Sequence, residues 1–137
     1  MAPQAAVRQR SLRAGDHSCA IRAGNGGVVC WGNHDQGQVT PPDIANGASG
    51  SASAISAGGA HSCAISAGTG AVVCWGINNW GQAIPPPSVD GTTGSAVAIA
   101  AGGRHTLALP EPDAALLLAS GVAGVVALGR RRIRNYR

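Results

Sequence analysis

The chain has 137 residues, enough for one modest domain and a tail. It has 21 glycines, 8 prolines, only 3% aromatic residues and no phenylalanine, so any apolar core is built mainly from small side chains. The net charge is +4, but five of the ten arginines lie in the last eight residues, behind an apolar run. A nucleic-acid-binding domain carries its basic charge on the folded body. The charge distribution therefore excludes nucleic acid as the expected partner and indicates a membrane.

An internal repeat runs through most of the chain with a period of 44 residues. The motif His-Ser-Cys-Ala-Ile begins at His17 and returns at His61, and a weakened form begins at His105. The motif Val-Val-Cys-Trp-Gly occupies 28–32 and returns at 72–76. A period of about 40–50 residues is typical of a propeller blade made of four short strands.

Each repeat is expected to form antiparallel strands joined by glycine-rich turns. Both motifs are short and rich in apolar and β-branched residues, and glycines lie between them. The predicted fold class is mainly β, an incomplete β-propeller of antiparallel blades followed by a C-terminal transmembrane helix. Besides the two motifs, we expect inner strands at 55–57 and 97–99, outer strands at 37–39 and 81–84, and connecting loops at 43–53 and 88–95.

The repeated motifs resemble the regulator of chromosome condensation repeat, whose members form seven-bladed propellers. The signature of Trp-Gly, Asn and Gly-Gln begins at Trp31 and again at Trp75. Gly rather than Asp follows each tryptophan, which separates the motif from the WD-repeat class. The resemblance implies repeats at 11–54 and 55–98 and a partial repeat at 99–109.

Two and a fraction blades cannot close a seven-bladed ring, and they leave unpaired strand edges. We expect the chain to be a fragment of a longer propeller; assembly with other copies and poor folding are the alternatives. Residues 1–10 are expected to be disordered. Residues 1–13 contain no apolar signal-peptide segment. We therefore expect in-frame DNA upstream of Met1 to encode a signal peptide and further repeats.

The four cysteines form one pair per repeat, Cys19 with Cys30 and Cys63 with Cys74, and the two members of each pair are eleven positions apart. Folding each segment about its glycine-rich turn places the pair on adjacent strands, with Cβ atoms about 4.5–5.5 Å apart. We expect two disulfides within the repeats and none between them, with Cα separations of roughly 4.4–6.8 Å. Each disulfide closes a short loop and should stabilise the folded protein by about 2–3 kcal/mol.

A metal site is an alternative use of the same side chains. His and Cys two positions apart on a strand share one face, but each repeat lacks a fourth ligand, and Leu107 replaces the cysteine in the third repeat. We therefore expect the histidines to be hydrogen-bonded within their blades. The two candidate ligand sets are His17, Cys19 and Cys30, and His61, Cys63 and Cys74.

Trp31 and Trp75, which occupy the same position in the two repeats, are expected to pack within the blades and not to stack on a ligand. Trp80 has no aromatic counterpart, since Gln36 stands at the equivalent position, so we expect its side chain to be exposed. The sequence shows no nucleophile elbow, recurring carboxylate pair or phosphate-binding glycine loop. We expect a protein that is not an enzyme and that needs no cofactor or metal.

Residues 110–137 differ in composition from the repeats. Pro110, Glu111 and Pro112 precede sixteen uncharged residues at 114–129, for which we expect a helix about 24 Å long. The bilayer core is about 30 Å thick, but terminal arginines can snorkel and the bilayer can thin. The positive cluster is expected on the cytoplasmic side, with the repeats outside. It consists of Arg130, Arg131, Arg132 and Arg134.

This tail resembles the PEP-CTERM sorting signal, which an exosortase-type membrane protease recognises and processes. The resemblance implies that Pro110, Glu111 and Pro112 are the recognition residues. It also implies an exported, non-enzymatic protein of the bacterial cell envelope, anchored by its tail and then placed at the cell surface or outside. There it would bind an unknown protein or polysaccharide. A metal-binding or enzymatic module and a secreted protein inhibitor are the alternatives.

Overall fold

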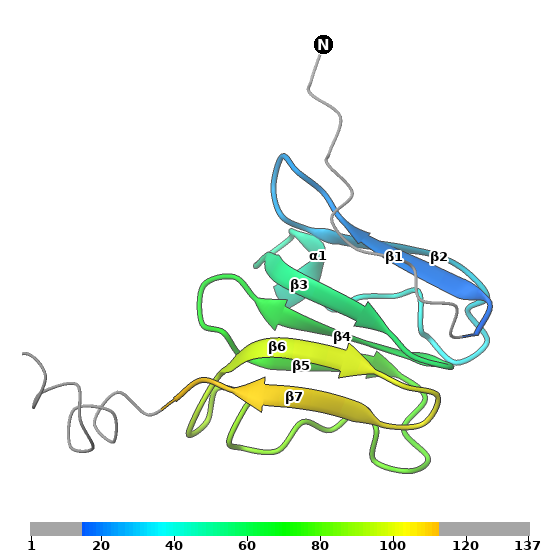
Figure 1. Ribbon diagram of the computed structural model, residues 1–137. Coiled ribbons are helices and arrows are strands. Elements are labelled where there is room, and N and C mark those ends of the chain that lie inside the picture. The colour runs from blue at the N-terminus through cyan, green and yellow to red at the C-terminus, as the bar shows by residue number, and fades with distance from the viewer. Residues whose placement is uncertain (1–14, 113–137) are drawn as a thin grey trace, which may run out of the picture.

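The computed structural model describes residues 15–112, in which seven short strands and one helical turn follow one another (Figure 1). The elements are β1 (His17–Ile21), β2 (Val28–Gly32), α1 (Asp43–Asn46), β3 (Ala52–Ala57), β4 (His61–Ser66), β5 (Val72–Gly76), β6 (Ala96–Ala101) and β7 (Thr106–Pro110). Within 15–112, no helix is long and apolar enough to span a membrane. The segments 1–10 and 114–129 and the arginine cluster lie outside the described residues.

The strands form three antiparallel sheets, β1–β2, β3–β4–β5 and β6–β7, stacked face to face in chain order (Figure 1). β1 contacts β3, and β6 contacts both β3 and β4. The β4–β5 hairpin has the same register as the β1–β2 hairpin 44 residues earlier. The prediction of antiparallel β-sheet repeats is confirmed. We call the interface between the first two sheets the first seam, and that between the last two the second seam.

The predicted outer strands at 37–39 and 81–84 are wrong, because both segments form turns. In the first turn, the amide of Thr40 donates to the carbonyl of Gly37, whose φ of 74° lies in the region that favours glycine. The second segment makes the equivalent bond. Backbone groups satisfied within a turn have no need of a neighbouring strand, and the Pro-Pro pair that follows each turn has no N–H to offer a ladder.

The loop expected at 43–53 begins instead with the helical turn α1. The amide of Ala45 donates to the carbonyl of Pro42 over 2.8 Å, and Gly47, with a φ of 95°, ends the turn. This geometry places Ala45 in the core, where it is 1% exposed. The corresponding loop of the next repeat places Val89 in the same way, at 2% exposure.

Apolar side chains pack together in both seams. Because the side chains of a strand alternate between its two faces, each repeat contributes to the seam on either side of it. The first seam buries Cys19, Val28, Ala45, Ala52, Ile55, Ala64 and Trp75. The second seam buries Cys63, Ile65, Val72, Val89 and Ala96.

Candidate functional site

Both predicted disulfides are present, and each lies within one hairpin. The Cα atoms of Cys19 and Cys30 are 4.1 Å apart, and those of Cys63 and Cys74 are 4.0 Å apart. No cysteine is free. The pairing within repeats is therefore confirmed, although both Cα separations are slightly shorter than we expected.

The position of each disulfide in its ladder explains the short separation. The amide of Arg22 donates to Gly27 at one end of the first hairpin, and the amide of Asn33 donates to Asp16 at the other. Cys19 lies opposite Cys30. Counting inward from these bonds makes the cysteines a non-hydrogen-bonded pair, the kind in which facing Cα atoms approach to about 4.5 Å.

The disulfides exclude the metal sites that were the alternative use of these side chains. A cysteine binds a metal as its thiolate, and both cysteines of each candidate set are committed to a disulfide. Each set then retains one histidine, and the described part of the chain contains no cluster of three or more His, Cys, Asp or Glu that could hold a metal. The metal hypothesis is therefore wrong for His17, Cys19 and Cys30, and for His61, Cys63 and Cys74.

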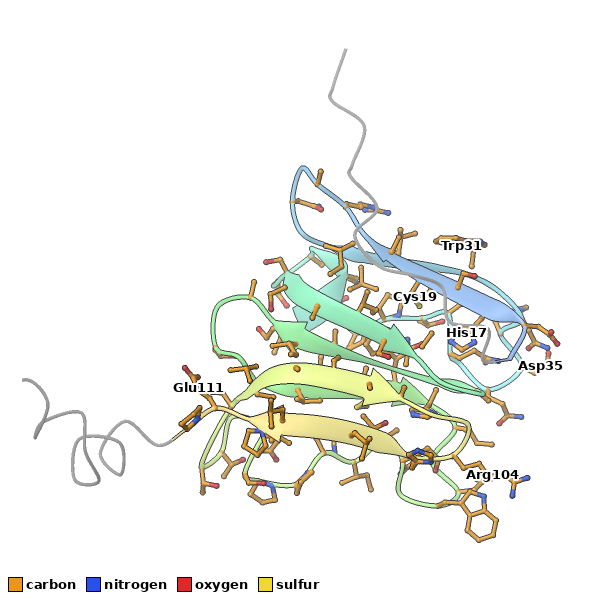
Figure 2. The ribbon with its side chains drawn as sticks, in the orientation of Figure 1. His17, Cys19, Trp31, Asp35, Arg104 and Glu111 are labelled. Carbon is orange, nitrogen blue, oxygen red and sulfur yellow. A yellow bond between two sulfur atoms is a disulfide. The ribbon has the colours of Figure 1, made fainter. Side chains whose placement is uncertain are left out.

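The two buried histidines hydrogen-bond across the seams, not within their blades as we expected. His17 Nε2 lies 2.9 Å from Ser62 Oγ, and His61 Nε2 lies 2.8 Å from Thr106 Oγ1. Figure 2 shows His17 among the side chains between the first two sheets. Each histidine therefore ties its own sheet to the next one along the chain.

Burial lowers the pKa of His17, and it lowers the pKa of His61 with smaller contributions from His17 and His105. Both buried rings are therefore favoured in the neutral form. Their Nδ1 atoms have no hydrogen-bond partner in the described chain. We assign the proton to Nε2, because a proton on Nδ1 would bury an unpaired donor. Nε2–H of His17 then donates to Ser62, whose hydroxyl donates to the carbonyl of Gln38.

Trp75 fills the first seam. Its side chain is 8% exposed, and its indole N–H donates to the carbonyl of Gln38 over 2.9 Å. The hydroxyl of Ser62 donates to the same oxygen over 3.4 Å. Trp31, at the same position in the first repeat, is 54% exposed and stands on the outer side of β2 (Figure 2). Burial of the side chain was therefore predicted correctly for Trp75, although it packs between two sheets and not within one blade, and wrongly for Trp31.

Glycines allow the turns that precede β1, β4 and β7 to approach one another closely. The amide of Gly59 donates to the carbonyl of Gly102 over 3.2 Å. A Cβ atom on Gly59 would lie 2.5 Å from the carbonyl oxygen of Gly103. A Cβ atom on Gly15 would likewise overlap the carbonyl oxygen of Gly59. Three glycines spaced 44 residues apart, Gly15, Gly59 and Gly103, thus lie against one another.

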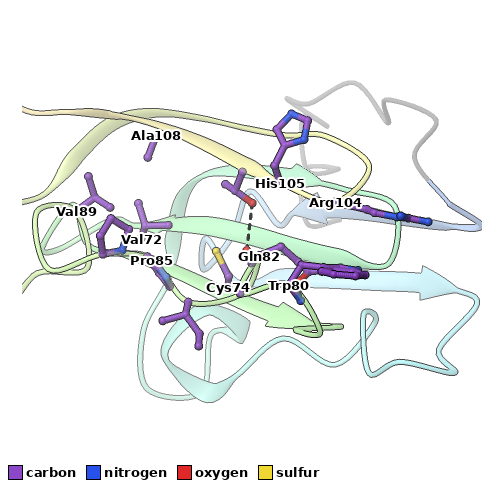
Figure 3. Close-up of a pocket in the computed structure, with 13 residues that line it drawn as sticks. Val72, Cys74, Trp80, Gln82, Pro85, Val89, Arg104, His105 and Ala108 are labelled. Carbon is purple, nitrogen blue, oxygen red and sulfur yellow. Dashed lines mark hydrogen bonds between the residues drawn. The ribbon is translucent and has the colours of Figure 1, made fainter.

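The second seam contains a cavity of about 240 Å³ (Figure 3). Val72 and Val89 form part of its apolar lining, and Thr106 and Gln82 contribute polar atoms. The hydroxyl of Thr106 donates to the carbonyl of Gln82 over 3.4 Å, as the dashed line in Figure 3 shows. The cavity therefore combines apolar side chains with a backbone acceptor, the carbonyl of Gln82.

Exposed side chains line the mouth of this cavity. Trp80, for which we expected exposure, is 72% exposed and lines the cavity together with Arg104 and His105. The sequence singled out Trp80 and His105 but not Gln82, whose role depends on a backbone carbonyl. The regular recurrence of Gly-Gln at 37–38 and 81–82 was the available signal.

The three residues expected to form the sorting motif begin inside the last sheet. Pro110 is the final residue of β7, beyond the repeat end expected at 109. The amide of Glu111 donates to the carbonyl of Ser95 over 2.8 Å, and the hydroxyl of Ser95 donates to Glu111 Oε2 over 2.7 Å. Pro112 is the last described residue. The glutamate is thus held by its backbone and its side chain at the edge of the repeats.

Comparisons with known proteins agree with this architecture. A profile of the Regulator of chromosome condensation (RCC1) repeat matches residues 52–82, which include β3, β4 and β5. Comparison with curated proteins found no significant match.

Among solved structures, the chain is similar to the CRINKLY WD40 ectodomain of the Arabidopsis thaliana receptor kinase ACR4, with 24% identity, a TM-score of 0.51 and coverage of 72% of this chain and 30% of that one. It is also similar to the entire ectodomain of the Physcomitrella patens receptor kinase CR4, with 28% identity, a TM-score of 0.52 and coverage of 72% and 26%. The fold is that of a β-propeller segment. The chain spans less than a third of each of these structures.

Proposed function

We propose that this chain is an exported, non-enzymatic repeat protein of the bacterial cell envelope, whose blades bind or scaffold a protein or polysaccharide partner. The observation that carries this proposal is the pair of disulfides, which uses every cysteine in the chain. Disulfides persist in oxidising compartments outside the cytoplasm. The similar solved structures are described as receptor ectodomains, which supports a binding role outside the cell.

We further propose that the tail acts as a sorting signal. Pro110, Glu111 and Pro112 would be recognised by an exosortase-type protease, and a helix at 114–129 would insert into the membrane. The support is the order of the three elements in the sequence, an acidic Pro-Glu-Pro motif, an apolar run and a basic end. The orienting residues would be Arg130, Arg131, Arg132 and Arg134.

The oxidised state that the proposal requires outside the cytoplasm is tested by the state of the cysteines in the producing cell. The full chain, with a signal peptide added, is recovered from the envelope under non-reducing conditions with free thiols blocked. Digestion and mass spectrometry should then find Cys19 linked to Cys30 and Cys63 linked to Cys74, with no blocked thiol. Free thiols in protein recovered from the envelope would contradict export as an oxidised protein.

The sorting proposal is tested in a host that contains an exosortase-type protease. Deleting 130–137 should impair retention or orientation, whereas Glu111→Ala should leave membrane insertion intact and block processing. Because Glu111 also bonds to Ser95, the matched control is Ser95→Ala, which removes the same hydrogen bond and keeps the carboxylate. Normal processing of the Glu111→Ala variant would contradict the sorting proposal and would mean that the tail acts only as a membrane anchor.

A further inference from the structure

The cavity in the second seam corresponds to the space that Trp75 fills in the first. Val28 and Ala45 belong to the apolar cluster that contains Trp75. The residues 44 positions further along the chain, Val72 and Val89, line the cavity. The two seams therefore present the same kind of apolar surface, and only the first has an indole between its walls.

The polar atoms of the two seams also correspond. In the first seam, the carbonyl of Gln38 accepts hydrogen bonds from both Ser62 and Trp75. In the second, the carbonyl of Gln82 accepts the equivalent bond from Thr106, and no indole in the described chain donates to it. The cavity therefore holds an acceptor whose counterpart in the first seam binds an indole N–H.

The edge of β7 shows how an indole could reach this position. In the middle sheet, β5 pairs with β4 and places Trp75 opposite Ser62. β7 is the counterpart of β4, yet its outer edge pairs with no strand among residues 15–112. Successive residues of a strand direct their backbone N–H and C=O groups alternately toward the strands on its two sides. The backbone groups of Thr106 and Ala108 are those that point to the outer edge of β7. A strand added there would place its residue opposite Thr106 into the cavity.

None of the three tryptophans of the chain is placed to fill the cavity. Trp75 occupies the first seam, and Trp80 lines the cavity itself. Trp31 lies on β2, at the far side of the first sheet, in a strand that a disulfide fixes to β1 (Figure 1). Position 119, which is 44 residues beyond Trp75, is an alanine. The tryptophans of the printed sequence therefore leave the cavity without an indole.

We propose that the second seam binds a tryptophan-bearing β-strand of a partner protein that is not a second copy of this chain. The strand adds to the outer edge of β7, its indole enters the cavity, and the indole N–H donates to the carbonyl of Gln82. A volume of about 240 Å³ suits one large side chain, since pockets for drug-sized ligands usually measure about 300–1,000 Å³. Strand addition supplies affinity through main-chain hydrogen bonds and specificity through such a pocket.

The partner segment is apolar and uncharged, like the Val-Val-Cys-Trp-Gly sequence of β5 that occupies the equivalent position. This inference goes beyond the proposed function and does not depend on export or on the sorting tail. Failure of the localisation tests would leave it standing, and its own failure would leave the proposed export untouched.

The test is a binding measurement with the full chain and a synthetic peptide copying residues 71–77 with Cys74→Ser. The matched control peptide also carries Trp75→Ala. Calorimetry should show binding of the first peptide and at least about tenfold weaker binding of the control, as expected for removal of a buried aromatic anchor. Amide resonances of Thr106 and Ala108 should shift with the first peptide.

Two variants of the chain locate the site. Ala108→Trp places a large side chain in the cavity and should weaken peptide binding by about tenfold or more. Leu107→Trp places the same side chain on the opposite face of β7, outside the cavity, and should change binding by less than about twofold. Thermal unfolding of both variants shows whether they fold. If the Ala108→Trp variant does not fold, the comparison of the tryptophan peptide with its Trp75→Ala control still tests the proposal.

The following results would overturn the proposal. The chain could fail to bind the tryptophan peptide, as it would if its own residues 116–120 occupied the edge of β7. The two peptides could bind equally, or Ala108→Trp could fold and leave binding unchanged. Finally, the full chain could self-associate in a manner lost on Trp31→Ala, which would make a second copy the occupant.

Discussion

The two seams share one plan and differ in one component. Both contain a buried histidine that bonds to a hydroxyl of the next sheet, at 2.9 Å in the first and 2.8 Å in the second. Both also have a hydroxyl that donates to the carbonyl of a buried glutamine, at 3.4 Å in each. The first seam contains an indole, whereas the second contains a cavity of about 240 Å³.

This difference shows that the contacts that align the sheets are distinct from the side chain that fills the space between them. Histidine–hydroxyl bonds and close glycine contacts occur in both seams, so the spacing of the sheets does not require a tryptophan. The tryptophan adds buried apolar area and one hydrogen bond. A seam without it keeps its alignment and gains room for a ligand.

The largest expected effect comes from making the first seam resemble the second. Trp75→Ala removes the indole from a site where it is 8% exposed and should lower the free energy of unfolding by about 3–5 kcal/mol. Urea unfolding of the purified full chain measures this change. Trp80→Ala is the control: its side chain is 72% exposed, so the change should stay within about 0.5 kcal/mol. Equal effects of the two substitutions would mean that Trp75 does not fill the first seam.

The next effect concerns the disulfide, since each of the two hairpins contains one. The double substitution Cys63→Ser with Cys74→Ser removes one disulfide from the middle sheet and should cost about 2–3 kcal/mol, mainly because the unfolded chain gains freedom. The matched control removes Cys19 and Cys30 in the same way, and since the loops are equal in length the entropic loss should be similar. Denaturation midpoints that do not change in either double variant would contradict this account.

A smaller effect is expected where the turns that precede β4 and β7 approach one another. Gly59→Ala would place Cβ 2.5 Å from the carbonyl oxygen of Gly103 and should destabilise the protein by about 1–3 kcal/mol. Gly103→Ala is the equivalent change one repeat later, where a Cβ atom would meet nothing within 4 Å. Thermal unfolding of both variants tests the comparison. Similar melting temperatures for the two would argue against close stacking of the turns.

The smallest effect is a dependence of stability on pH that both seams produce. Burial lowers the pKa of His17 and His61 below the ordinary value of 6.5. Below pH 6.5 the unfolded chain therefore binds more protons at these residues than the folded chain does. Their contribution is complete above about pH 6.5 and is lost as the pH falls toward the lowered folded-state pKa.

Urea unfolding measured between pH 7.5 and pH 5 tests this dependence. His61→Gln should flatten the decline on acidification, because it removes one of the two titrating groups. A stability that rises on acidification across this interval would contradict the assignment of neutral buried histidines. A decline of equal steepness in the His61→Gln variant would show that other groups cause it.

Much of the fold was predictable from the period of 44 residues. Two copies of each motif, at the same distance from each other, predicted β1, β2, β4 and β5 and the pairing of the cysteines. The outer strands were predicted wrongly because Gly-Gln followed by apolar residues reads as a short strand. The turns are set by bonds such as that from Thr40 to Gly37, which the pattern of hydrophobic residues does not report.

The candidate site was less predictable, because it depends on which neighbour each residue meets. The sequence treats Trp31 and Trp75 as equivalent, yet only Trp75 has a described sheet on the side that it faces. The histidines were expected to bond within their blades, but their partners lie 45 positions along the chain. A period identifies equivalent residues and does not show across which seam they act.

The most direct test of the equivalence between the seams is a structure of the full chain bound to the peptide that copies residues 71–77 with Cys74→Ser. The account predicts that the peptide pairs with β7 and that its indole N–H reaches the carbonyl of Gln82, at a distance close to the 2.9 Å between Trp75 and Gln38. An indole bound elsewhere, or a cavity occupied by residues 116–120 of the chain itself, would contradict it.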